Sequence, residues 1–132
     1  LGALLRRIIV GYVTAAVYTR AIHRFATRHV RAGGTAHRYV ISWAAPGNPY
    51  GAAHTVDLPL LFGDEPTWAG TGLVAGAAWE DIDAAARQVR RLWADFARGQ
   101  PLGDAGRIPG VLRHRRVRVP FRVGPMRRRP PG

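Results

Sequence analysis

The sequence of 132 residues contains no cysteine, no lysine and only one methionine. Without cysteine the chain can form no disulfide, no thiolate metal site and no cysteine nucleophile, and its redox compartment stays undecided. Acidic residues are scarce, because eight Asp and Glu stand against twenty basic residues, all of them arginine. We attribute the arginine bias to GC-rich coding sequence rather than to selection for bidentate phosphate contacts.

Long apolar segments are also missing. The uncharged run of the N-terminal apolar segment, residues 8–19, has twelve residues, whereas a membrane-spanning helix needs about 20. We therefore expect no transmembrane segment. The chain begins with Leu1 rather than Met and shows no signal peptide, so we interpret its N terminus as cut and leave its localisation open between cytoplasmic and secreted.

The basic charge is concentrated near the end of the chain. Residues 101–132 hold nine arginines and one acid, a net charge of +8 out of the total of +12. We therefore divide the chain into a domain portion, residues 1–102, and an Arg-, Pro- and Gly-rich tail, residues 103–132. Alternation over residues 116–123 predicts an edge strand within the tail, and residues 126–132 are expected to be disordered.

Hydrophobic periodicity predicts two main helices. Over residues 4–30 apolar residues recur every three or four positions, which indicates one helix, or two helices broken near Gly11. We favour a core-facing helix with a solvated basic face over a membrane-surface helix, and we expect Gly33 and Gly34 to end it. Residues 79–98 form the second helix, with acids early and arginines late, as the helix dipole favours.

Alternation of side chains predicts a strand over residues 36–43. An irregular loop rich in Pro and Gly follows at residues 46–51 and leaves His54 exposed beyond the carboxyl end of the strand. Catalytic residues of α/β sheets usually lie at such strand ends. Residues 63–78 are Gly-rich and are expected to form a loop with one helical turn.

The candidate catalytic residue is His54, in the segment GAAHTVDLPLLFG of residues 51–63. A histidine acts as general base near neutral pH when a nucleophile and an orienting carboxylate lie beside it. Asp57 is three residues away, which is unusual for the acid of a triad, and Ser42 lacks the G-x-S-x-G turn that exposes a nucleophile. From the residues alone, two interpretations of His54 stay open: a functional histidine, or a histidine of a loop or of the core.

The other histidines make no recognisable ligand set. His23 and His29 lie six residues apart, a spacing that does not bring them to one face of a helix, and His37 with His54 provides only two donors. A zinc site needs three or four convergent ligands, so we expect no metal. The glycines between residues 63 and 76 lack the G-K-[ST] ending of a phosphate loop, and we expect no nucleotide cofactor.

The segments YVISW, PGNPYGAAH and VDLPLLFG, within residues 39–63, resemble the C-terminal part of type B carboxylesterases. This branch of the α/β-hydrolase fold includes para-nitrobenzyl esterases and cholinesterases. In that family a strand leads to a loop whose G-A-x-H carries the triad histidine, followed by an acid and L-P-x-x-F-G. The residues that match this order and spacing are His54, Asp57, Leu58, Pro59, Phe62 and Gly63.

The resemblance extends over roughly residues 12–102. LWADFARGQP is similar to the W-x-x-F-A-x-x-G-x-P helix of the family, whereas residues 14–21 match its T-D-x-x-F-x-x-P segment only in part, with Ala15 replacing Asp. The resemblance implies that the chain is the C-terminal portion of an α/β-hydrolase fold, made of helices and the last strands of the central sheet.

The resemblance also implies a function, the hydrolysis of a small-molecule carboxylic ester through an acyl-enzyme, with His54 as the general base. Triad order in this fold is serine, acid, histidine, so the nucleophile, the acid and the oxyanion loop are expected in an upstream part of the same domain. Phe62 and Trp68 are candidates to line the substrate pocket. No cofactor is implied.

The alternative function is a non-catalytic basic module that contacts nucleic acid or an acidic membrane through the Arg-rich tail. Against nucleic acid, Phe121 is the only aromatic residue after residue 100, so the tail lacks the stacking platforms of single-strand binders. The sequence therefore favours the hydrolase.

Overall fold

The computed structural model describes residues 2–119. Its elements are, in order, α1 (Gly2–Val13), the π-helix η1 (Thr14–Thr19), α2 (Arg20–Arg31), β1 (His37–Ile41), α3 (Asp57–Phe62), α4 (Glu65–Trp68), α5 (Trp79–Ala97), β2 (Ala105–Ile108) and β3 (Leu112–Arg116). The chain divides into two compact units: residues 37–116, and residues 1–36 with the residues after 116. The two units are described separately.

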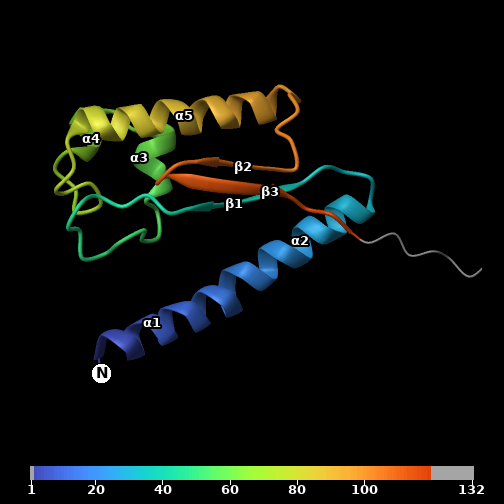
Figure 1. Ribbon diagram of the computed structural model, residues 1–132, viewed down its shortest axis with the longest axis horizontal. Helices are drawn as coiled ribbons and strands as arrows, with labels where there is room; N and C mark the ends of the chain where they lie inside the picture. Colours follow the sequence, from blue (N-terminus) through green and yellow to red (C-terminus); the bar gives the residue numbers. More distant parts are fainter. Residues whose placement is uncertain (1, 120–132) are drawn as a thin grey trace, which may run out of the picture. The chain divides into compact units, whose positions relative to one another are not determined.

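The unit of residues 37–116 is a three-stranded antiparallel sheet with helix α5 along one face (Figure 1). The strand order is β1-β3-β2, so the last strand of the chain lies between the other two. Tyr39 is opposite His114 and Ile41 is opposite Leu112, and these residues belong to the face that packs on α5. The expected strand and the expected second helix are both confirmed, with bounds that differ by at most two residues at either end.

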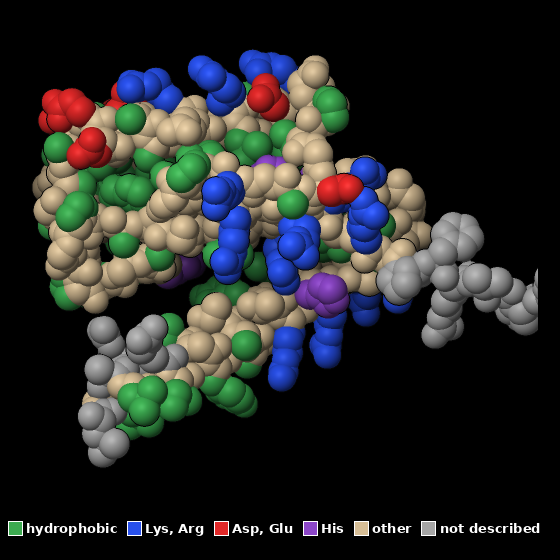
Figure 2. Space-filling model, in the orientation of Figure 1, with side chains coloured by type: hydrophobic (Ala, Val, Ile, Leu, Met, Phe, Trp, Pro, Cys, Tyr) green, Lys and Arg blue, Asp and Glu red, His purple; other side chains and the backbone are tan. Residues whose placement is uncertain are grey.

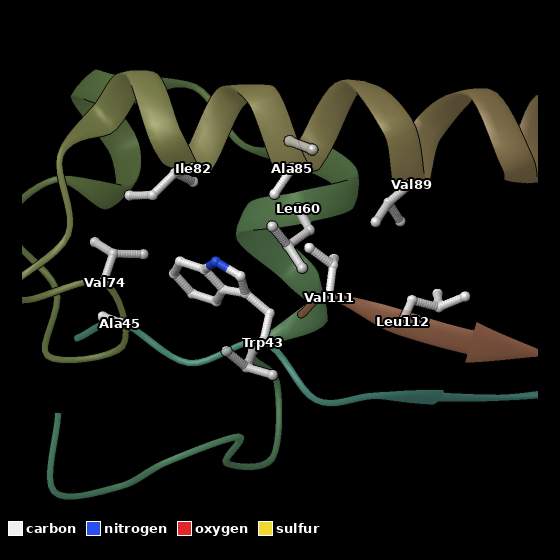
Figure 3. Packing of buried hydrophobic residues seen from close by; sticks show 11 residues of the cluster. Trp43, Ala45, Leu60, Val74, Ile82, Ala85, Val89, Val111 and Leu112 are labelled. Atoms are coloured by element: carbon white, nitrogen blue, oxygen red, sulfur yellow. The ribbon is translucent and has the colours of Figure 1, made fainter. Parts of the chain in front are cut away.

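The hydrophobic core lies between α5, α3 and the loops around the sheet (Figure 3). Helix α5 contributes Ile82, Ala85, Ala86 and Val89, which recur at the spacing of one helix face and are at most 6% exposed. Leu60 of α3 is fully buried against this face. Trp43 follows β1 into the same cluster, so the loop that leaves the strand is fixed at its start.

The other unit is a helix that runs through α1, η1 and α2. The prediction of a possible break at Gly11 was wrong, because α1 continues past this residue to Val13. The irregularity is the π-helix η1 that follows. Gly33 ends the helical segment with a φ of +92°, and the amide of Gly34 donates to the carbonyl of His29, as a C-terminal cap requires.

The apolar side chains of this helix do not face a core within the described chain. Ile8, Tyr12 and Phe25 are 58%, 71% and 75% exposed, so the core that this helix is expected to face is not found within the described residues. Periodicity shows that a helix has an apolar face but not what covers that face. Among the described residues no helix is both long and apolar enough to cross a membrane.

Residues 103–116, which the sequence analysis assigned to the tail, form the β2–β3 hairpin of the sheet. The edge strand expected over residues 116–123 is wrong for its described part, because β3 ends at Arg116 and residues 117–119 are not in a strand. In β3 the buried positions are Leu112 and His114 and the exposed ones are arginines, so the strand contains too few apolar residues for hydrophobic periodicity to predict it. The disorder expected over residues 126–132 concerns residues outside the described range.

Candidate active site

His54 lies in the loop that joins β1 to α3, beyond the carboxyl end of the strand. Asn48 anchors this loop, because its side-chain amide donates to the carbonyl of Gly72 at 2.6 Å and its side-chain oxygen accepts the amide of Tyr50 at 2.9 Å. The carbonyl of Pro46 lies so close to Gly76 that a side chain there would collide with it. The loop is therefore held against the segment between α4 and α5.

A tight turn presents the His54 side chain. The amide of Val56 donates to the carbonyl of Ala53, which closes a turn with His54 and Thr55 at its centre. Thr55 has a φ of +72°, a left-handed conformation that is rare for a β-branched residue and costs roughly 1–3 kcal/mol. Strain of this kind is retained only where the surroundings enforce it and is frequent at functional sites.

Burial immediately after the turn enforces this conformation. Val56 is 4% exposed and Leu60 is fully buried under α5, whereas His54 itself is exposed. The turn is thus fixed on one side by Asn48 and on the other by the apolar residues of α3. The resulting arrangement presents an imidazole at a fixed place on the surface, where it could transfer protons to and from a reacting group.

The other predicted site residues lie in different surroundings. Ser42 is exposed just after β1, and its amide donates to the carbonyl of Val111 at 2.8 Å, so it belongs to the edge of the sheet rather than to a nucleophile turn. Phe62 is 75% exposed at the end of α3, and Trp68 is partly buried at the end of α4. Within the described residues the structure does not assemble a triad from these groups.

Asp57, the acid nearest to His54 in sequence, is the first residue of α3 and acts on Tyr39 of β1. Burial raises the pKa of Tyr39 above its ordinary value of 10.0, and the negative charge of Asp57 raises it further. Both causes disfavour the phenolate. The carboxylate is therefore electrostatically coupled to the strand that leads into the His54 loop.

We expect the Asp57→Asn substitution to lower the pKa of Tyr39 partway toward its ordinary value, because the charge is removed while burial remains. Titration of the tyrosines by absorbance at alkaline pH, with Tyr39→Phe to assign the signal, measures this shift. Asp64→Asn is the matched control, since Asp64 also precedes a short helix but does not act on Tyr39. An unchanged Tyr39 pKa in Asp57→Asn would contradict the coupling.

The remaining histidines do not form a metal site. His23 is exposed on α2, and His29 stacks on Phe25 with 6.5 Å between ring centroids. Within residues 2–119 no group of three or more His, Cys, Asp or Glu residues is placed to hold a metal ion.

Sequence reasoning missed a pair of histidines under α5. His37 and His114, on neighbouring strands, lie 5.7 Å apart between ring centroids, and the buried Nδ1 atom of each has no hydrogen-bond partner. With Trp93 and Phe96 they line a largely apolar cavity of about 130 Å³. The alternation of Leu112 and His114 is the signal that could have placed His114 on this face.

Burial is the main cause that lowers the pKa of His37 below its ordinary value of 6.5. The neighbouring charges of His114 and Arg116 lower this pKa further, and Asp104 acts in the opposite direction. Since the unfolded chain then binds the proton more readily than the folded chain, stability is retained above pH 6.5 and decreases as the pH falls below it.

We expect the urea midpoint of the protein to fall between pH 8 and pH 5, and to fall less in His37→Gln, which cannot titrate. Urea unfolding followed by circular dichroism at both pH values measures the difference. His23→Gln, an exposed histidine on α2, is the control. If His37→Gln and the parent lost the same stability on acidification, His37 would not be the titrating group.

Comparison with known proteins shows sequence similarity to a curated hydrolase. The chain is 34% identical over 103 residues to the "Probable N-octanoylanthranilate hydrolase AqdA2" of Rhodococcus erythropolis. This chain is related to a hydrolase. The similar region covers 78% of the chain but only 22% of the relative, so the chain spans about a fifth of the length of that protein.

Two other comparisons gave no match. No protein-family model matches the chain. No solved structure matches it either. The relationship to the Rhodococcus hydrolase therefore rests on sequence similarity.

Proposed function

We propose that this chain is the C-terminal part of a serine hydrolase of the type B carboxylesterase family, that it has the α/β-hydrolase fold, and that His54 is its general base. The observation that carries the proposal is the fixed, strained turn that presents His54 between β1 and α3. The relationship to a hydrolase over most of the chain supports the same role. The resemblance of residues 39–63 to the histidine loop of carboxylesterases matches His54 to the catalytic histidine of that family.

In the proposed reaction His54 accepts the proton of an upstream serine hydroxyl as the serine oxygen attacks the carbonyl carbon of the substrate. The carbon–oxygen bond to the alcohol then breaks, and protonated His54 returns the proton to the departing oxygen. Water repeats the sequence on the acyl-enzyme and releases the carboxylic acid. The serine, the triad acid and the oxyanion donors are contributed by residues outside this chain.

Exposed apolar side chains on the helix of residues 2–31 support the proposal of a larger domain. Leu4, Val17 and Ile22 are 62%, 56% and 50% exposed. Monomeric soluble proteins rarely leave contiguous apolar surface of this kind uncovered. In the proposed hydrolase, the upstream part of the domain covers it, which agrees with the fifth of the relative's length that the chain spans.

The substrate class that we propose is a small carboxylic ester. The name of the Rhodococcus relative concerns an octanoyl group carried on the nitrogen of anthranilate, which is an amide. The same acyl-enzyme chemistry cleaves esters and amides, and the ester is the easier substrate because an alkoxide leaves more readily than an amine. A test should therefore compare p-nitrophenyl octanoate with N-octanoylanthranilate.

The deciding experiment measures hydrolysis of these two compounds by the hydrolase that contains this chain, with His54 intact and with His54 replaced by alanine. Loss of ester turnover in the variant supports the proposal. Turnover of the amide without turnover of the ester would replace the proposed substrate class and leave the role of His54 in place.

A further inference from the structure

Four arginines gather on the face of the sheet opposite α5. Arg38 of β1 and Arg115 of β3 are directly opposite each other, and Arg107 of β2 is directly opposite Arg113 of β3. All four are exposed. Because alternate residues of a strand point to opposite faces, this register brings arginines from three strands to one face. Figure 2 shows basic side chains in blue over the strands as well as along α5.

The arrangement costs stability when no anion is bound. Like charges directly opposite each other in an antiparallel sheet repel and destabilise the pairing. On α5 and its end, by contrast, Asp83 binds Arg87 and Arg90, and Asp95 binds Arg98. None of the four sheet arginines takes part in these ion pairs.

The same four arginines line a hollow of about 540 Å³, together with Val40, Ala105, Gly106 and His114. Guanidinium groups bind phosphate oxygens in a bidentate fork, and two neighbouring forks can share one phosphate or bind successive ones. Along β3, Arg113 and Arg115 are two residues apart, or roughly 6.6 Å at the rise of a strand. The hollow is therefore a positively charged track across three strands.

We propose that this face, defined by Arg38, Arg107, Arg113 and Arg115, binds the phosphate backbone of double-stranded nucleic acid without sequence preference. Its composition selects this partner. A protein partner requires an apolar interface centre with aromatic anchors, and the hollow offers only Val40 and Ala105. Single strands require aromatic stacking platforms, and the hollow has no Phe, Tyr or Trp side chain, its one ring being the buried His114. A membrane surface is favoured by apolar groups that enter the lipid, which are lacking as well.

This proposal does not depend on the hydrolase activity, and it differs from the alternative considered for the sequence. There the binding element was an Arg-rich tail of residues 103–132. Here three arginines of that segment belong to the folded β2–β3 hairpin, and Arg38 of β1 completes the face. The sheet register, and not the local density of arginine, creates the site.

The test measures binding of the 132-residue chain to a fluorescently labelled 20-base-pair DNA duplex between 50 and 200 mM salt. Four phosphate contacts predict a slope of about −3.6 for log K against log[salt]. We expect Arg38→Gln, Arg107→Gln, Arg113→Gln and Arg115→Gln combined to weaken binding at 50 mM salt at least about tenfold and to reduce the magnitude of the slope by about 3 to 4.

Two matched variants separate this face from general basicity. Replacing Arg87, Arg90, Arg91 and Arg98 by Gln removes the same charge from α5 and its end, and ending the chain at residue 119 removes the four arginines that follow. We expect both to retain most of the affinity. Circular dichroism verifies that each variant keeps its fold, and the pair Arg38→Gln with Arg115→Gln serves if the fourfold variant does not fold.

An equal or larger loss of affinity in either matched variant would overturn the proposal, as would a salt slope that the sheet substitutions leave unchanged. Vesicles of anionic and zwitterionic lipid provide the last comparison. Binding of the chain to anionic vesicles, without binding to the duplex, would refute nucleic acid as the partner of this face.

Discussion

The His54→Ala variant of the hydrolase that contains this chain should lose ester hydrolysis by about 10⁶-fold in kcat, the scale seen when a triad histidine is removed. The physical reason is that the serine oxygen then has no base to accept its proton, and the leaving alcohol has no acid to protonate it. Steady-state kinetics with p-nitrophenyl octanoate, with KM changing much less than kcat, measures the effect.

His23→Ala is the matched control, because His23 is an exposed histidine on α2 outside the His54 loop. It should retain the activity of the parent enzyme. The isolated 132-residue chain should show no turnover above background, since it contains no G-x-S-x-G nucleophile turn. Rates close to those of the parent in His54→Ala would remove this residue from the mechanism, and turnover by the isolated chain would show that the serine does not lie upstream.

Replacing Leu60 by alanine should lower the free energy of unfolding by about 2–5 kcal/mol, a large part of the roughly 5–15 kcal/mol that stabilises a domain. Leu60 is fully buried between α3 and α5, so the substitution removes apolar contacts and leaves a cavity beneath the His54 loop. Urea unfolding followed by tryptophan fluorescence measures the loss, and the buried Trp43 in the same cluster makes this signal sensitive to it.

The control for this experiment lies on the same helix. Phe62→Ala removes a larger side chain, but Phe62 is 75% exposed, so the change should stay within about 0.5 kcal/mol in this chain. If Phe62→Ala cost as much as Leu60→Ala, the exposed side of α3 would be packed in solution, and the position of the His54 loop would need revision.

The elements that the sequence predicted well are those whose signal is local. Helix α5 places its apolar residues at three- and four-residue spacing, and Gly99 closes it with a φ of +73°. Strand β1 alternates, with Arg38 and Val40 on the face opposite Tyr39 and Ile41. The position of His54 in a loop after this strand was also anticipated correctly. Its catalytic role stays a prediction, as does the carboxylesterase assignment.

The elements that the sequence missed depend on partners far along the chain. Strands β2 and β3 contain few apolar residues, so nothing local distinguishes them from a basic tail, and they become strands by pairing with β1. Helix α3 is six residues long, which is too short for hydrophobic periodicity to indicate a helix. The sequence analysis identified this segment only through the family motif around His54. The helix of residues 2–31 was predicted, but its exposed apolar face was not.

By itself, the sequence determined the apolar stripe of α5, the alternation of β1 and the segment that contains His54, because each is a pattern of neighbouring residues. Only the tertiary structure decided the strained turn at Thr55, the pairing of His37 with His114 and the gathering of four arginines on one face. The His37–His114 pair and the arginine face arise from strand register across about 75 residues. The turn is held by Asn48 hydrogen bonds and by burial of α3. Sequence patterns do not encode contacts at such separations, since these contacts form only when packing brings distant segments together.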